Sequence, residues 1–229
     1  YMEELSHFAK KNNLIIIEDA AEAFGVWESK KHMGTFGDYG IFSLFANKTI
    51  TSGEGGIILT NSEENYKKLY RIKNHGRDKK GVFIHENIGY NFCFNDLNAA
   101  IGVAQIKKIN EIIKLKKRNY NFYKENLGSL NGVKLMQVDE RIASNYWFVN
   151  ILVDNPELLQ NHLKSDKIGS RRFFYPMHKQ PCFNNEYSLT ENNYPNTNYL
   201  YNHGLSLPSS PNLSLHDLNR VLDSIKKYK

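Results

Sequence analysis

Residues 41–59 constrain the fold of this 229-residue chain more than any other stretch. An apolar run at 41–45 predicts a buried strand, and a second run at 57–59 follows a polar, glycine-rich turn. Lys48 lies between the two runs. A lysine there is costly unless its ammonium group is paired, solvated or neutralised, for example as a Schiff base with a carbonyl group. An ordinary solvated loop lysine is the simpler interpretation of these residues alone, since most lysines are exposed.

Another apolar run, at residues 14–17, ends in the carboxylates Glu18 and Asp19. Carboxylates at the carboxyl end of a buried strand lie where open α/β sheets bind their ligands. An aspartate that only caps the following turn is the alternative interpretation. The two regions together favour an α/β fold with a ligand site at one edge of its sheet.

Composition excludes some classes of function. Hydrophobic residues make up 41% and charged residues 24%, as in ordinary globular proteins. No apolar run approaches the ~20 residues that span a membrane, and no secretory leader opens the chain, so we expect a cytoplasmic protein without a membrane partner. The net charge of +6 is spread along the chain, and its densest basic run, at 107–118 on an expected helix, has no interleaved aromatic residues, so we expect no nucleic-acid partner. Cys93 and Cys182 lack metal-site spacing, and we expect reduced thiols and no metal.

Apolar periodicity and capping residues predict the remaining elements. Helices are expected at 3–11, from Ser62 to 73, from Asp96 to 127, from Asn155 to 165, and after Ser214. Strands are expected at 14–18, 40–45, 56–60, 133–137, 146–153 and 170–175, and a surface loop at 184–198.

Seven motifs resemble, in the same order, those of the DegT/DnrJ/EryC1/StrS family of sugar aminotransferases, which use pyridoxal 5'-phosphate (PLP). They lie at residues 17–25, 34–38, 42–56, 73–77, 88–102, 173–178 and 205–208. Each motif is weak alone, but together they cover almost the whole chain. The resemblance implies an α/β protein of the aspartate aminotransferase-like fold (fold type I).

The resemblance also implies how the chain is divided. Residues 1–115 would form the C-terminal half of the large PLP-binding α/β domain, and residues 116–229 a small C-terminal α+β domain. Family members carry a further N-terminal part, with a phosphate loop and half of the main sheet. We therefore expect this chain to be a C-terminal fragment, inactive if it occurs alone.

Five residues of the first half match cofactor-binding positions of the family. Lys48 would form the Schiff base and act as general acid and base, and Asp19 would keep the pyridine nitrogen protonated. Glu22 matches the residue beside the phenolic oxygen of PLP, where His or Gln is common. Ser43 matches a phosphate-binding hydroxyl group, and Asn91 an asparagine that reaches the phosphate of the partner subunit in family dimers.

Other positions bear on the substrate. Arg172, Tyr175 and His178 are expected to contact the sugar, although packed aromatic residues at an ordinary strand end are an equal alternative. Cys93 replaces the Arg or Asn common at its position, so one charge-assisted contact of that loop is in doubt.

The resemblance implies an enzyme that moves an amino group from L-glutamate to a nucleotide-linked 4-keto-6-deoxy sugar. Residues 173–181 are similar to the perosamine synthase branch, so the expected reaction converts GDP-4-keto-6-deoxymannose to GDP-perosamine for surface-polysaccharide synthesis, such as that of lipopolysaccharide. A homodimer with active sites at its interface is expected. The alternatives are a non-catalytic fragment or regulatory relative of the same fold, and a PLP-dependent sugar dehydratase, which usually lacks the lysine.

Overall fold

The computed structural model describes residues 1–79, 81–139, 141–183 and 193–228. The chain forms two compact units: unit 1 contains Tyr1–Ile113 and Asp139–Asn145, and unit 2 contains Lys114–Val138 and Tyr146–Lys229. We call Asp139–Asn145 the return segment, because the chain comes back to unit 1 there. The expected assignment of residues 1–115 and 116–229 to two domains stays a prediction. None of the helices in the described ranges is both long and apolar enough to cross a membrane.

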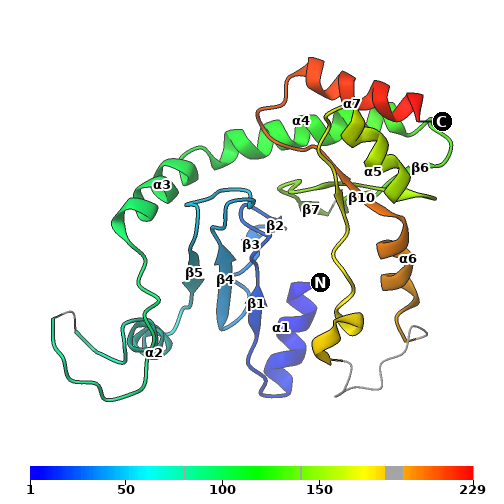
Figure 1. Ribbon diagram of the computed structural model, residues 1–229. Coiled ribbons are helices and arrows are strands. Elements are labelled where there is room, and N and C mark those ends of the chain that lie inside the picture. Colours follow the sequence, from blue (N-terminus) through cyan, green and yellow to red (C-terminus); the bar gives the residue numbers. More distant parts are fainter. Residues whose placement is uncertain (80, 140, 184–192, 229) are drawn as a thin grey trace. The chain divides into compact units, whose positions relative to one another are not determined.

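Unit 1 contains two three-stranded sheets (Figure 1). In the first, β1 (Ile17–Asp19) is parallel to β4 (Tyr39–Ser43), which is antiparallel to β5 (Gly56–Leu59). In the second, β2 (Trp27–Glu28) lies between β3 (Lys31–His32) and β7 (Ile142–Ala143). The helices that begin in this unit are α1 (Met2–Lys11), α2 (Glu63–Lys73), α3 (Asp96–Ile106) and α4 (Ile109–Leu127).

Alternation along β1 separates its two carboxylates, because successive side chains point to opposite faces of a strand. Glu18 is buried, and its carboxylate accepts hydrogen bonds of 2.6 Å from the backbone N–H groups of both Gly34 and Gly37. Gly40 has to be glycine, because a Cβ there would lie 1.8 Å from the carbonyl oxygen of Gly34. Glu18 therefore organises the loop before β4, and Asp19 is left on the opposite, exposed face.

Unit 2 contains a four-stranded antiparallel sheet in the order β6–β8–β10–β9 and a single hydrophobic core. Its strands are β6 (Val133–Leu135), β8 (Val149–Val153), β9 (Arg171–Arg172) and β10 (Gly204–Leu207). Its helices are most of α4, then α5 (Pro156–Ser165), α6 (Pro195–His203) and α7 (Leu215–Lys227), with 3-10 turns at Met177–Lys179 and Pro181–Phe183. The apolar face expected on the last helix is buried in this core.

Two expected elements of unit 1 are wrong in detail. The helix expected from Asp96 to 127 is divided into α3 and α4 by a turn, in which Lys108 N–H bonds back to the carbonyl of Gln105. The N-cap of α3 is Asn95 rather than Asp96, because the Asn95 side chain accepts from Asn98 N–H. The strand expected at 14–18 begins only at Ile17, since the turn that ends α1 still includes residues 12–14.

Differences in unit 2 concern strand length and one helix. The strand expected at 170–175 contains only Arg171–Arg172, and that at 146–153 begins at Val149. The loop expected at 184–198 ends earlier than predicted, because α6 begins at Pro195, where proline suits the first turn of a helix. Residues 184–192 of that loop lie outside the described residues.

Candidate active site

Lys48 lies in a closed loop between β4 and β5. The backbone of Leu44 closes the loop twice: its N–H donates to Gly55 (2.9 Å), and its carbonyl accepts from Ser52 N–H (3.0 Å). Ile50, two residues after Lys48, is almost completely buried and fixes the loop to unit 1. The backbone that carries Lys48 is therefore ordered by its own hydrogen bonds and by packing.

The amino group of Lys48 has a carboxylate partner. Its Nζ lies 3.6 Å from Oε1 of Glu22, in the loop that follows β1. The Lys48 side chain is only 16% exposed, whereas that of Glu22 is 56% exposed. Lys48 is thus largely withdrawn from water, and an ion pair offsets part of the cost of burying its charge.

Asp19 and Ser43 lie at the carboxyl ends of β1 and β4, which are parallel neighbours and so end at the same edge of the sheet. Asp19 pairs with Ile41, and Ser43, two residues further, projects to the same face. Asp19 Oδ1 accepts from Ala21 N–H (3.2 Å), as the capping alternative expects, and Ser43 Oγ accepts from Phe45 N–H (3.2 Å). The second oxygen of Asp19 and the hydroxyl hydrogen of Ser43 can still serve a ligand.

Asn91 lies at the base of a long loop. Its backbone forms an isolated antiparallel bridge with Asn74, and next to it His75 N–H donates to the carbonyl of Tyr90 (3.0 Å). The neighbouring Cys93 directs its thiol at the carbonyl of Lys73 (3.5 Å). The backbone of Asn91 is therefore fixed, while its contact with a phosphate stays a prediction.

The three substrate candidates lie in unit 2. Arg172 donates to the carbonyl of Tyr201 (2.7 Å), and the ring of Tyr175 meets the ring of Tyr201 edge to face. His178 stacks on Tyr194 with ring centroids 4.6 Å apart. Arg172 Nε and His178 Nε2 are buried without a hydrogen-bond partner in the part of the chain that the structure describes. Their roles toward a sugar stay predictions.

Two polar residues that hold the loop after β1 were not predicted. The amide of Asn145, on the return segment, contacts both the loop after β1 and Thr49, although 96 residues separate it from Thr49. His32 accepts a hydrogen bond at Nε2 from Gly25 N–H (2.9 Å). No spacing pattern connects such distant positions, and an isolated asparagine or histidine carries no signal in a single sequence.

Comparison with known proteins identifies the family. Residues 1–226 match the model of the DegT/DnrJ/EryC1/StrS aminotransferase family, and the chain belongs to this family. It is 37% identical over 230 residues to the GDP-perosamine synthase of Escherichia coli O157:H7, and 34% identical over 232 residues to that of Vibrio cholerae. Each alignment covers 99% of this chain but 62% of the relative, so the chain spans less than two thirds of their length.

The fold agrees with the family. A solved DegT DnrJ EryC1 StrS aminotransferase from Brucella abortus superposes with a TM-score of 0.90 at 25% identity, over all of this chain and 61% of the solved one. The family and the α/β, aminotransferase-type fold expected from the motifs are therefore confirmed.

Proposed function

We propose that this chain is the lysine-bearing part of a PLP-dependent aminotransferase, which transfers an amino group from L-glutamate to a nucleotide-linked 4-keto-6-deoxy sugar. One observation carries the proposal. In a chain of this family, the lysine of the family motif is largely withdrawn from water, and its amino group lies 3.6 Å from a carboxylate. The alternative, a sugar dehydratase of this fold, usually lacks the lysine, so the presence of Lys48 favours amino transfer.

The side chains at this edge of the sheet fit PLP by their chemistry. Lys48 offers an amine for the aldehyde, Asp19 a carboxylate for the protonated pyridine nitrogen, and Ser43 a hydroxyl donor for the phosphate. Glu22 fits less simply, because a carboxylate beside the phenolic oxygen has to share a proton with it. Its pairing with Lys48 gives it a role that does not depend on that oxygen.

PLP, when bound, supplies an aldehyde and a ring that accepts electrons. Lys48 would hold the cofactor and then carry a proton at Nζ between the two halves of the reaction, as a general acid and base. Asp19 would keep the ring nitrogen protonated through an ion-pair hydrogen bond. Ser43 and Asn91 would orient the phosphate, Asn91 from the partner subunit.

GDP-4-keto-6-deoxymannose is the substrate that we propose, giving GDP-perosamine for surface polysaccharide. The support is the identity of 34–37% to two proteins named GDP-perosamine synthase. In unit 2, Arg172 and His178 are polar side chains of the kind that bind sugar hydroxyl groups, and the half-exposed ring of Tyr175 can cover an apolar sugar face. The cytoplasmic location stays a prediction.

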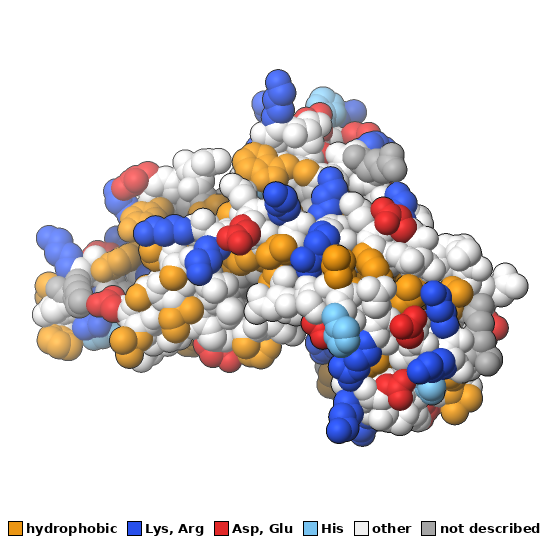
Figure 2. All heavy atoms as spheres, turned by 90° about the horizontal axis from the view of Figure 1, so that it is seen from above, with side chains coloured by type: hydrophobic (Ala, Val, Ile, Leu, Met, Phe, Trp, Pro, Cys, Tyr) orange, Lys and Arg blue, Asp and Glu red, His pale blue; other side chains and the backbone are white. Residues whose placement is uncertain are grey.

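We further propose a homodimer, supported by apolar surface on unit 1. Helix α3 buries none of its residues, yet it carries exposed Leu97, Ile101, Val103 and Ile106, with Leu97 at 81% exposure. Patches of apolar side chains between basic ones are visible at the molecular surface in Figure 2. Extensive exposed apolar surface marks protein interaction sites. Sedimentation equilibrium tests the dimer directly.

The test of the enzyme uses the longest natural protein that contains this chain, purified with PLP. After borohydride reduction and proteolysis, we expect the mass of the cofactor on the peptide that contains Lys48, and no such mass in Lys48→Arg. With L-glutamate, GDP-4-keto-6-deoxymannose should yield an amino sugar faster than dTDP-4-keto-6-deoxyglucose does. PLP attached at another lysine would overturn the proposal, and a sugar product without nitrogen would favour the dehydratase.

A further inference from the structure

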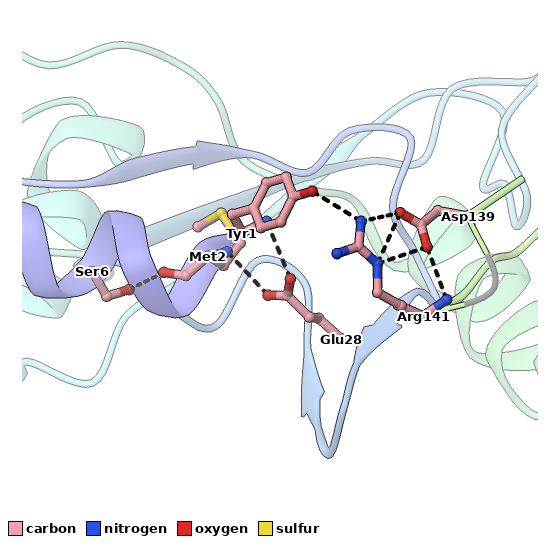
Figure 3. A network of polar contacts seen from close by, with 6 residues as sticks. All are labelled: Tyr1, Met2, Ser6, Glu28, Asp139 and Arg141. Atoms are coloured by element: carbon pink, nitrogen blue, oxygen red, sulfur yellow. Dashed lines mark hydrogen bonds and ion pairs between the residues drawn. The ribbon is translucent and has the colours of Figure 1, made fainter.

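The return segment is fastened to unit 1 before it reaches Asn145. The guanidinium group of Arg141 donates to the carboxylate of Asp139 (2.5 Å) and to the hydroxyl of Tyr1 (3.0 Å) (Figure 3). Hydrogen bonds from Arg141 lower the pKa of Asp139 to about 2, so this pair is charged at neutral pH. Strand β7 then pairs with β2. The backbone before Asn145 is therefore held to the rest of unit 1 at two points, by the hydrogen bond from Arg141 to Tyr1 and by the pairing of β7 with β2.

The side-chain amide of Asn145 is surrounded by three oxygen atoms. Its Nδ2 lies 2.7 Å from the carbonyl oxygen of Glu22, 3.1 Å from that of Phe24 and 3.1 Å from Oγ1 of Thr49. Asn145 is only 3% exposed, so water cannot replace these contacts at low cost. A single nitrogen thus connects the backbone that carries Glu22 to the residue next to Lys48.

This connection explains why the two charged groups meet. Lys48 and Glu22 lie on different loops, and an exposed carboxylate such as that of Glu22 gains little from a surface ion pair alone. The loop of Glu22 is also held at Gly25, whose N–H donates to His32. The hydrogen bonds of Asn145 join this loop directly to Thr49, the residue after Lys48.

We propose that Asn145 is a positioning residue for Lys48: its amide holds the loop of Glu22 against Thr49, which keeps the Glu22 carboxylate at the Lys48 amine. The geometric part concerns this chain alone, while the catalytic part rests on the proposed function. Two of the three oxygens around the amide are backbone carbonyls, which can only accept, so a carboxylate in place of the amide would repel the loop of Glu22. The loops would separate, and Lys48 would lose the Glu22 carboxylate and become more exposed to water.

Four variants separate this role from general stability. Asn145→Asp keeps the shape but replaces the donor with an acceptor, and Thr49→Val removes only the acceptor beside Lys48. Thr49→Ser keeps the hydroxyl group and should behave like the natural protein. Asn119→Ala is the matched control, because Asn119 is a fully buried asparagine of unit 2 whose amide donates to Ser210.

The first measurement is made without cofactor, on the longest natural protein that contains this chain. Lysines are labelled by reductive methylation, and the labelling rate at Lys48 is followed by peptide mass spectrometry. We expect labelling roughly 10-fold faster in Asn145→Asp and about 3-fold faster in Thr49→Val, in line with the modest net effect of one hydrogen bond. In Thr49→Ser and Asn119→Ala, the labelling rate at Lys48 should stay within about twofold of that in the natural protein, a smaller change than the loss of one hydrogen bond produces.

The second measurement uses the holoenzyme and separates kcat from KM. Asn145→Asp and Thr49→Val should lower kcat by factors similar to their increases in labelling rate, about 10-fold and about 3-fold. KM for the amino donor should stay unchanged, because the substitutions affect the lysine and not substrate binding. Should Asn145→Asp fail to fold, Thr49→Val alone decides the matter. Unchanged Lys48 labelling in a folded Thr49→Val, or equal acceleration in Asn119→Ala, overturns the proposal. Altered labelling without any amino transfer in the natural protein would refute the proposed function but leave the positioning intact.

Discussion

Lys48 in unit 1 and Lys116 in unit 2 are both poorly exposed, but their surroundings differ. Lys48 pairs with the carboxylate of Glu22, at the edge of a parallel strand pair. Lys116 is 6% exposed and donates to two backbone carbonyls, those of Trp147 (3.1 Å) and Ser209 (3.2 Å). Burial lowers the pKa of Lys116 to about 8.

The comparison shows that a shifted pKa does not by itself make a lysine catalytic. Perturbed pKa values are enriched at functional sites, and on that criterion alone Lys116 would be selected. Its partners, however, are carbonyls that it ties together inside unit 2, a structural task. Lys48 instead has an ionisable side chain beside its amino group, the carboxylate of Glu22, and its role in chemistry stays a prediction. The contrast between the two lysines, and between the units that hold them, can be tested by experiment.

The largest expected effect concerns the two lysines themselves. Lys48→Arg keeps the charge but cannot bond covalently to an aldehyde or move a proton, so amino transfer should fall by at least about 1,000-fold. Lys116→Met should retain transfer within about 3-fold, since the partners of Lys116 are backbone carbonyls of unit 2 and not residues of the proposed site. Steady-state rates at a temperature well below both unfolding transitions check this. A comparable loss in Lys116→Met would abolish the distinction between the lysines.

The next largest expected effect is a difference between the two units in the unfolding free energy lost when an apolar side chain is truncated. Leu218 in α7 is completely buried in the core of unit 2, so Leu218→Ala should cost about 2–5 kcal/mol of unfolding free energy. Ile41 lies on the exposed face of β4, and Ile41→Ala should cost less than about 1 kcal/mol. Urea unfolding followed by circular dichroism measures both. Equal costs would mean that the face of β4 is covered in solution.

How much of the structure the sequence could predict depends on how far apart along the chain the interacting residues lie. Helix starts at Ser62, Asn155 and Ser214 rest on contacts within three residues, and the sequence predicted all three. The placement of Asp19 and Ser43 at one edge of the sheet was also predictable, because they end neighbouring strands, while their roles stay predictions. Interactions of long range were not: nothing local announces that β7 joins the sheet of β2 and β3.

The site shows the same limit at the level of single side chains. Two adjacent carboxylates, Glu18 and Asp19, look alike in sequence, and only strand alternation gives the first to backbone N–H groups. Asn145 approaches Thr49 because the chain returns from unit 2. The break between α3 and α4 occurs at lysines, which are good helix formers, so propensity pointed the wrong way.

The dependence of unfolding free energy on pH should reveal the titration of the buried Lys116 amino group. Its pKa is about 8 in the folded chain and 10.5 ordinarily, so between these values the unfolded chain binds more protons. Unfolding free energy therefore rises with pH there, by about 2 kcal/mol between about pH 7 and 9.5. Burial raises the pKa of Tyr123, which opposes this rise only above about pH 10, the ordinary value for tyrosine.

The rise should vanish in Lys116→Met and persist in Lys117→Met, since Lys117 is the exposed neighbour on the same helix. Denaturant unfolding at the two pH values, followed by the fluorescence of Trp147 in a Trp27→Phe background, provides the measurement for unit 2. Parallel behaviour of the two variants would assign the pH dependence to other groups and remove Lys116 from the comparison.

The smallest expected effect compares one helix cap in each unit. Asn155 Oδ1 accepts from Leu158 N–H (3.0 Å) and caps α5, whose Leu159 is fully buried in the core. Ser62 caps α2 in the same way, through Asn65 N–H, but α2 buries none of its residues. Loss of either cap costs about 1 kcal/mol locally.

The two losses should be detected differently, because cooperativity depends on packing. Asn155→Ala should lower the global stability of unit 2 by about 1 kcal/mol, since α5 cannot fray without opening the core. Ser62→Ala should instead speed amide hydrogen exchange in the first turn of α2, with unit 2 unaffected. If Ser62→Ala lowered global stability as much as Asn155→Ala, α2 would have to pack against a surface that this chain does not itself provide. Unit 2, which has its own core, would then differ from unit 1 in that unit 1 needs a partner to bury its helices.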